Sequence, residues 1–178
     1  LEFRRVLFRS FWEKHGKGME SWQKDDRSYY KLSGPLVPSL LVNQFLWQEG
    51  PNPFHARVAD LAGNTATLVT IRDYSHHKNN VWGITARNRE QNFALNALMD
   101  PDIDFVSLLG QAGTGKTLLT LAAGLTQILE SKTYSEIIMT RVTVPVGEDI
   151  GFLPGTEEEK MTPWMGALED NLDVLNKP

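Results

Sequence analysis

The 178-residue chain contains no cysteine, which excludes disulfide bonds and thiolate metal sites. It also lacks any apolar run of about 18 residues, the length that predicts a membrane-spanning helix. Basic residues are not in excess: the formal net charge is −4, and residues 83–178 carry fourteen acidic against seven basic side chains. Such a composition lacks the footprint of a strong nucleic-acid binder and suits one globular domain, or a small domain with part of another.

The motif with the clearest chemistry lies in residues 104–129. An apolar run over residues 105–109 leads directly into the phosphate-loop pattern G-x-x-x-x-G-K-[ST], and a helical pattern of Leu, Ala and Ile follows it. The loop residues are Gly110, Gln111, Ala112, Gly113, Thr114, Gly115, Lys116 and Thr117. An apolar strand, a glycine-rich loop and a helix in this order predict a site for a nucleoside triphosphate.

The residue types of this loop fit phosphate chemistry. Backbone N–H groups must wrap the phosphates, and a side chain at Gly113 or Gly115 would obstruct that wrap. A helix that begins near Gly115 directs its positive dipole end toward the same place. Lys116 is expected to reach the β- and γ-phosphates and Thr117 to ligate Mg²⁺, which makes these two the predicted catalytic residues. The alternative is a glycine-rich turn with a surface lysine.

A second helical pattern covers residues 87–99 and ends before Asp100-Pro101. Asn88 is the predicted N-cap, and Gln91 stands three positions later in a capping-box arrangement. Gln91 therefore has two interpretations, which can coexist. It caps its own helix, or its amide reads the edge of an adenine base.

The patterns together predict an α/β fold, a partial P-loop NTPase whose parallel sheet has the order strand, P-loop, helix, strand. The two apolar runs at residues 105–109 and 136–140 are the expected parallel strands, because a helical crossover separates them. Short alternating runs and the hairpin signal Gly63-Asn64 predict a small antiparallel β unit before this sheet. An amphipathic helix is predicted over residues 164–175.

The chain divides by pattern into four parts. Residues 1–10 resemble a translated adapter or cloning scar and are left out of the fold prediction, although a genuine amphipathic helix is the alternative. Residues 11–35 are interpreted as a linker or the end of a preceding domain, and residues 36–82 as the β unit. Residues 83–178 would form the N-terminal half of a nucleotide-hydrolysing domain.

One expected element is missing after the loop. Phosphoryl transfer needs an acidic residue that holds Mg²⁺ through water, normally at the end of an apolar strand. No apolar strand that ends in Asp follows Lys116. We therefore expect a C-terminally truncated fragment that does not hydrolyse ATP on its own.

A set of short motifs in fixed order resembles the PhoH-like ATPase family. The set comprises Arg87-Asn88 with Glu90-Gln91, GQAGTGKT, Thr140-Arg141, VPVGEDIGFLPG with Glu159-Lys160, Pro163-Trp164 and Asp170-Asn171-Leu172. The version here is similar to the subgroup in which a PIN ribonuclease domain precedes the ATPase, although this chain has no PIN-type cluster of aspartates.

The resemblance implies a cytoplasmic protein that binds and hydrolyses ATP with Mg²⁺, is related to superfamily one helicases and assembles as a ring-like homo-oligomer. RNA remodelling or decay is the implied process. Arg141 and residues 144–155 would line a face where RNA or a neighbouring subunit docks, although Arg141 could equally pair with Glu148 or Asp149. Two alternatives remain: a nucleotide-gated switch without useful turnover, in which ATP orders residues 144–155, and a non-functional truncated product.

Overall fold

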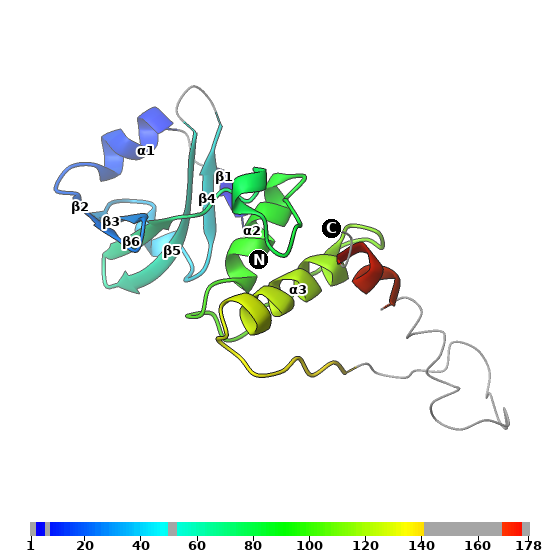
Figure 1. The fold of residues 1–178 in the computed structure, drawn as a ribbon. Coiled ribbons are helices and arrows are strands. Elements are labelled where there is room, and N and C mark those ends of the chain that lie inside the picture. Colours follow the sequence, from blue (N-terminus) through cyan, green and yellow to red (C-terminus); the bar gives the residue numbers. More distant parts are fainter. Residues whose placement is uncertain (1–2, 6–7, 50–52, 141–168, 176–178) are drawn as a thin grey trace, which may run out of the picture.

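The computed structural model describes all residues except 1–2, 6–7, 50–52, 141–168 and 176–178, and one β-sheet dominates it (Figure 1). The sheet has six strands in the order β1-β4-β5-β6-β3-β2, and strands β2 to β6 pair antiparallel, whereas β1 pairs parallel with β4. The strands are β1 (Phe3–Arg5), β2 (Glu20–Lys24), β3 (Arg27–Ser33), β4 (Phe45–Gln48), β5 (Phe54–Ala62) and β6 (Thr65–Thr70).

One α-helix precedes strand β2 in the chain, and the other α-helices follow strand β6. The α-helices are α1 (Phe8–His15), α2 (Arg89–Leu98) and α3 (Lys116–Leu125), and α3 continues as a π-helical turn, η3 (Thr126–Glu130). Short 3₁₀ turns are η1 (Val37–Ser39) and η2 (His77–Asn79). Residues 169–175 are helical, and the remainder of the helix predicted over 164–175 lies outside the described residues. No helix in the described ranges has the length and apolar character needed to cross a bilayer.

Tight turns with positive backbone φ join the neighbouring strands. Gly63, with φ of 58°, lies between β5 and β6, where Ala62 pairs with Thr65, so the predicted hairpin is confirmed. Asp25 and Asp26 have φ of 50° and 59° between β2 and β3, the signature of a type I′ turn. Residues 20–33, part of the segment 11–35 that was interpreted as a linker or the end of a preceding domain, thus form a hairpin of the same sheet.

Apolar side chains pack against both faces of the sheet. One face packs under α1 and η1 in a core that contains Phe11, Leu46, Val58 and Leu68. On the other face, the Phe45 ring of β4 stacks on Phe93 of α2 with centroids 4.7 Å apart and planes inclined by 14°. Both rings are fully buried, so this contact joins α2 firmly to the sheet.

The predicted parallel sheet is wrong for the part of the chain that the structure describes. Residues 105–109 and 136–140 are not strands, and the sheet that forms is essentially antiparallel. Phe105, Leu109 and Ile138 are 84%, 95% and 77% exposed. An apolar run becomes a strand only when neighbouring strands take its backbone N–H and C=O groups, and among the described residues these two runs have no such neighbour.

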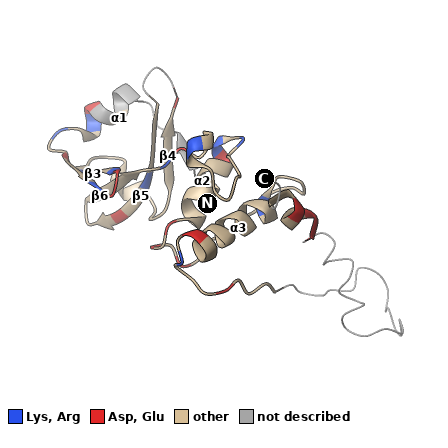
Figure 2. Ribbon diagram, in the orientation of Figure 1, with Lys and Arg blue, Asp and Glu red and all other residues tan. Residues whose placement is uncertain are grey.

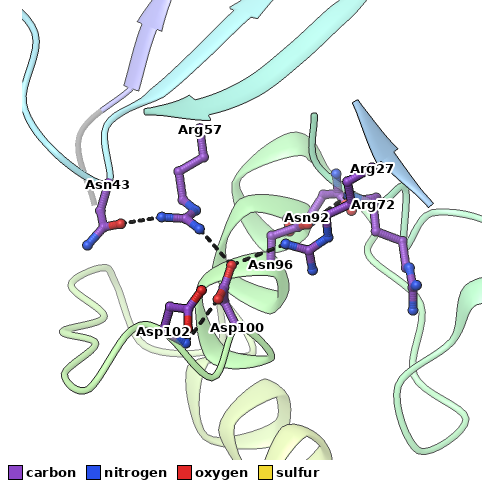
Figure 3. Close-up of polar contacts among 8 residues, drawn as sticks. All are labelled: Arg27, Asn43, Arg57, Arg72, Asn92, Asn96, Asp100 and Asp102. Carbon is purple, nitrogen blue, oxygen red and sulfur yellow. Dashed lines mark hydrogen bonds and ion pairs between the residues drawn. The ribbon is translucent and has the colours of Figure 1, made fainter. Parts of the chain in front are cut away.

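A buried polar network ties the end of α2 to the sheet (Figure 3). The Oδ2 atom of Asp100 accepts from Arg57 of β5 at 2.7 Å and from Arg27 of β3 at 3.2 Å, and Arg57 also donates to the Asn43 side chain. Only 4% of the Asp100 side chain and 8% of the Arg57 side chain are exposed. The opposite charges of Arg57 and Asp100 therefore compensate each other at a place that water hardly reaches.

Two asparagines of α2 hold the segment that leaves β6. Asn92 accepts from the backbone N–H of Tyr74 at 2.7 Å. Asn96, one turn later, accepts from the N–H of Arg72 at 2.8 Å and donates to its carbonyl at 2.8 Å. Both asparagine side chains are buried, so their hydrogen bonds fix the segment after β6 against α2.

Candidate nucleotide site

The loop between residues 110 and 117 is folded as a compact turn and is not extended. Gly113 and Gly115 have φ of 78° and 85°, in the left-handed region that glycine tolerates best. Gly115 is the N-cap of α3, and Lys116 is its first helical residue. The loop therefore ends where the first turn of a helix presents backbone N–H groups without intrahelical acceptors.

The Lys116 ammonium lies against the loop that precedes it. Its Nζ atom donates to the carbonyl oxygens of Gly110 at 2.9 Å and Gln111 at 2.6 Å, and to the Thr114 hydroxyl at 3.3 Å. The Thr114 hydroxyl in turn donates to the Gln111 carbonyl at 2.9 Å. These bonds close the loop around one positive charge, so loop shape and charge position depend on each other.

The rest of the loop faces solvent. Residues 110–114 and Thr117 are exposed, and Gly115 and Lys116 are half-buried. Two surface hollows, of about 210 and 420 Å³, lie elsewhere, the first lined in part by Leu41 and Ile103 and the second by Arg27 and Arg72. A ligand of this loop would thus be held at an open surface, with access from solvent to Lys116 and to the Thr117 hydroxyl.

Helix α2 begins beside this loop, and its N-cap is the predicted residue, whereas the reciprocal bond of a capping box is made to a different N–H. The Asn88 side chain accepts from the backbone N–H of Gln91 at 2.8 Å, which confirms the N-cap. The Gln91 Oε1 atom accepts from the N–H of Arg87 at 2.8 Å, one residue before the position that a standard capping box uses. Gln91 therefore bonds the residue that precedes the N-cap and closes the turn that leads into its own helix.

Gln91 also contacts the phosphate loop, which sequence patterns did not reveal. Its Nε2 atom donates to the Thr114 carbonyl at 3.2 Å across 23 positions of sequence. The contact places the predicted adenine-reading side chain at the predicted phosphate site. The Oε1 atom accepts one hydrogen bond and the Nε2 group donates one. Each can make two, so one acceptor and one donor position of the Gln91 amide remain by count.

Basic and acidic side chains, Arg89 and Glu90, stand side by side at the start of α2 (Figure 2). Burial raises the pKa of Glu90, but hydrogen bonds from its own backbone N–H and from Arg89 outweigh burial, so the net pKa lies below its ordinary value. Glu90 is therefore ionised at neutral pH in the first turn, where a negative charge favours the helix dipole. Arg89 also pairs with Glu49 at 2.9 Å and lies 3.6 Å over the Trp47 ring.

Comparison with known proteins adds family evidence to this geometry. Residues 83–177, which contain α2, the loop and α3, match the family model described as PhoH-like protein. The chain belongs to the PhoH-like protein family. The resemblance drawn from its motifs is thereby confirmed, whereas nothing bears on a PIN domain.

PhoH-like relatives from three organisms illustrate the similarity. Protein PhoH2 of Bacillus subtilis is 44% identical over 133 residues, which are 70% of this chain and 30% of that protein. Protein PhoH2 of Thermobispora bispora is 46% identical over 99 residues, 55% of this chain and 23% of the relative. A PhoH-like protein of Mycobacterium tuberculosis is 47% identical over 70 residues, 39% of this chain and 20% of the relative. The chain thus spans less than a third of these relatives, and no solved structure matches it.

The structure describes only some of the remaining site residues that were predicted from the sequence. Arg141 and residues 144–155, with the expected docking face for RNA or a neighbouring subunit, lie outside the described residues. Within the described ranges, no three His, Asp or Glu side chains gather as a metal site. Thr117, the predicted Mg²⁺ ligand, is the second residue of α3 and is exposed.

Proposed function

We propose that the protein to which this chain belongs binds and hydrolyses ATP with Mg²⁺ and couples hydrolysis to RNA remodelling or decay. The observation that carries the proposal is the closed loop around Lys116 at the start of α3, within the family match. It combines glycines at positive φ, a helix N-terminus and an ammonium, three features that favour phosphate binding.

The loop amides, Lys116, Thr117 and Gln91 have separate roles in nucleotide binding. The amides of residues 110–117 bind phosphate oxygens, and one oxygen replaces a present acceptor of the Lys116 ammonium. The Thr117 hydroxyl would hold Mg²⁺, which neutralises phosphate charge when bound. Gln91 lies within reach of a nucleotide on the loop, and its remaining donor and acceptor positions allow adenine reading. Lys116 and Thr117 fit their roles because both lie in the first turn of α3 and both are at least partly exposed to solvent.

The wider setting belongs to the same proposal. The RNA partner, the ring-like homo-oligomer and the cytoplasmic location follow from what the family resemblance implies. Arg141 and residues 144–155 would serve the docking of RNA or of a neighbouring subunit. The 178-residue chain alone is expected to bind nucleotide but not to hydrolyse it, because its sequence after Lys116 contains no apolar run that ends in Asp, the pattern of an acidic Mg²⁺-holding strand.

A test of Mg²⁺ binding uses Thr117. We expect Thr117→Ala to reduce Mg²⁺-dependent ATP affinity by about tenfold, the scale of one bond to a charged group. Thr117→Ser, which keeps the hydroxyl, should retain the affinity. The measurement is isothermal titration calorimetry with ATP, in Mg²⁺ and in EDTA. Full Mg²⁺ enhancement in Thr117→Ala would contradict this role.

A further inference from the structure

The Gln91 side chain links helix α2 directly to the phosphate loop. Its Oε1 atom accepts from the Arg87 N–H at 2.8 Å, and its Nε2 atom donates to the Thr114 carbonyl at 3.2 Å. A backbone N–H only donates and a carbonyl only accepts, so these partners fix the orientation of the amide. The donor end of Gln91 therefore points at the loop.

The loop residue that Gln91 contacts occupies a central position. The Thr114 hydroxyl bonds both the Gln111 carbonyl and the Lys116 ammonium, at 2.9 and 3.3 Å. The next residue, Gly115, has φ of 85° and caps α3, and a Cβ atom built there would lie 3.3 Å from Gln91 Nε2. A hydrogen bond to the Thr114 carbonyl thus fixes the peptide that sets both the turn and the Lys116 position.

Helix α2 gives this bond a rigid origin. Asn92 and Asn96 clamp the segment after β6, and Phe93 stacks on Phe45 of β4. Ala94 and Leu95 of α2 pack in one core cluster with α3. Because α2 is held on both sides, Gln91 projects from a fixed point, and its bond limits the motion of the loop relative to the helix.

We infer that Gln91 is a positioning residue that holds the phosphate loop in its binding shape, in addition to any contact with a base. The inference rests on the proposed function, because it concerns the same phosphate site. It assigns Gln91 an effect on every ligand that carries a triphosphate group, whatever base is attached. A residue that only reads adenine would affect ATP alone.

The test compares three ligands on the 178-residue chain. Gln91→Met is neutral and similar in length but makes neither side-chain bond. We expect this variant to bind GTP and inorganic tripolyphosphate, each with Mg²⁺, with about fivefold lower affinity, the scale of one lost neutral hydrogen bond. Its affinity for ATP with Mg²⁺ should fall by at least as much. Asn88→Ala, which removes the helix cap but keeps the Thr114 contact, is the matched control and should change all three by less than twofold. A loss for ATP with GTP and tripolyphosphate unchanged would overturn the inference.

A second measurement requires no ligand. Backbone ¹⁵N relaxation should show faster motion at Gly113, Thr114 and Gly115 in Gln91→Met, and unchanged values in Asn88→Ala. Unchanged loop relaxation in Gln91→Met would overturn the positioning role. If the wild-type chain binds none of the three ligands, the proposed function fails for this chain, while relaxation still decides whether Gln91 positions the loop.

Discussion

Replacement of Lys116 by alanine in the full-length protein is expected to abolish ATP hydrolysis, with a rate at least 100- to 1,000-fold below wild type. The change removes the ammonium that would stabilise charge on the β- and γ-phosphates. It also removes the donor shared by the Gly110 carbonyl, the Gln111 carbonyl and the Thr114 hydroxyl, so the loop loses its internal closure. Both effects act on the same step. The measurement is phosphate release under saturating ATP and Mg²⁺.

Two control variants separate the role of Lys116 from a general loss of charge. Lys132 is an exposed lysine beyond η3, so Lys132→Ala should hydrolyse ATP at the wild-type rate. Lys116→Arg keeps the charge but replaces a compact ammonium with a planar fork, and it should recover only part of the activity. Hydrolysis that persists in Lys116→Ala would refute the assigned role of the loop.

The same experiment tests the alternative of a nucleotide-gated switch. A full-length wild-type protein that binds ATP but releases no phosphate, with or without RNA, would favour the switch. Stimulation of phosphate release by RNA would favour the coupled enzyme. A partner that is coupled to hydrolysis would change the rate of phosphate release by the wild-type protein. The Lys116→Ala variant should show no such change.

Local signals were the reliable part of the sequence analysis. The Asn88 cap, the Gly63 turn and the start of α3 at the loop each depend on a few adjacent residues, and all are observed. A cap or turn is stabilised by bonds within a short segment, so its residue pattern carries most of the information. By contrast, residues 11–35 were interpreted as a linker or the end of a preceding domain, yet Asp25 and Asp26 in this segment adopt the positive φ of a hairpin turn.

Long-range partners were the part that patterns could not supply. The apolar runs at 105–109 and 136–140 look like strands, but whether an apolar run pairs depends on neighbours elsewhere in the chain. The bond from Gln91 to Thr114 spans 23 positions, and the pair of Arg57 with Asp100 spans 43. Asp100 resembled only a helix stop before Pro101, and nothing in its local pattern marked it as the partner of two buried cations.

That buried carboxylate carries the largest predicted effect on stability. Asp100→Asn should lower the free energy of unfolding by about 3–5 kcal/mol, the cost of removing one partner of a buried ion pair. Arg57 is nearly inaccessible to water, so its charge would be left without full compensation, and Arg27 would lose the same acceptor. The measurement is urea unfolding of the 178-residue chain, followed by tryptophan fluorescence and circular dichroism.

The matched variants identify the cause of that loss. Asp102 is exposed two positions away, so Asp102→Asn should cost less than about 1 kcal/mol. The double variant Arg57→Met with Asp100→Leu removes both buried charges, and it should be more stable than Asp100→Asn because apolar groups can fill such a site. Arg27 then turns to solvent, which its 25% exposed side chain can reach. A loss below 1 kcal/mol in Asp100→Asn would mean that water, rather than Asp100, compensates the charge of Arg57.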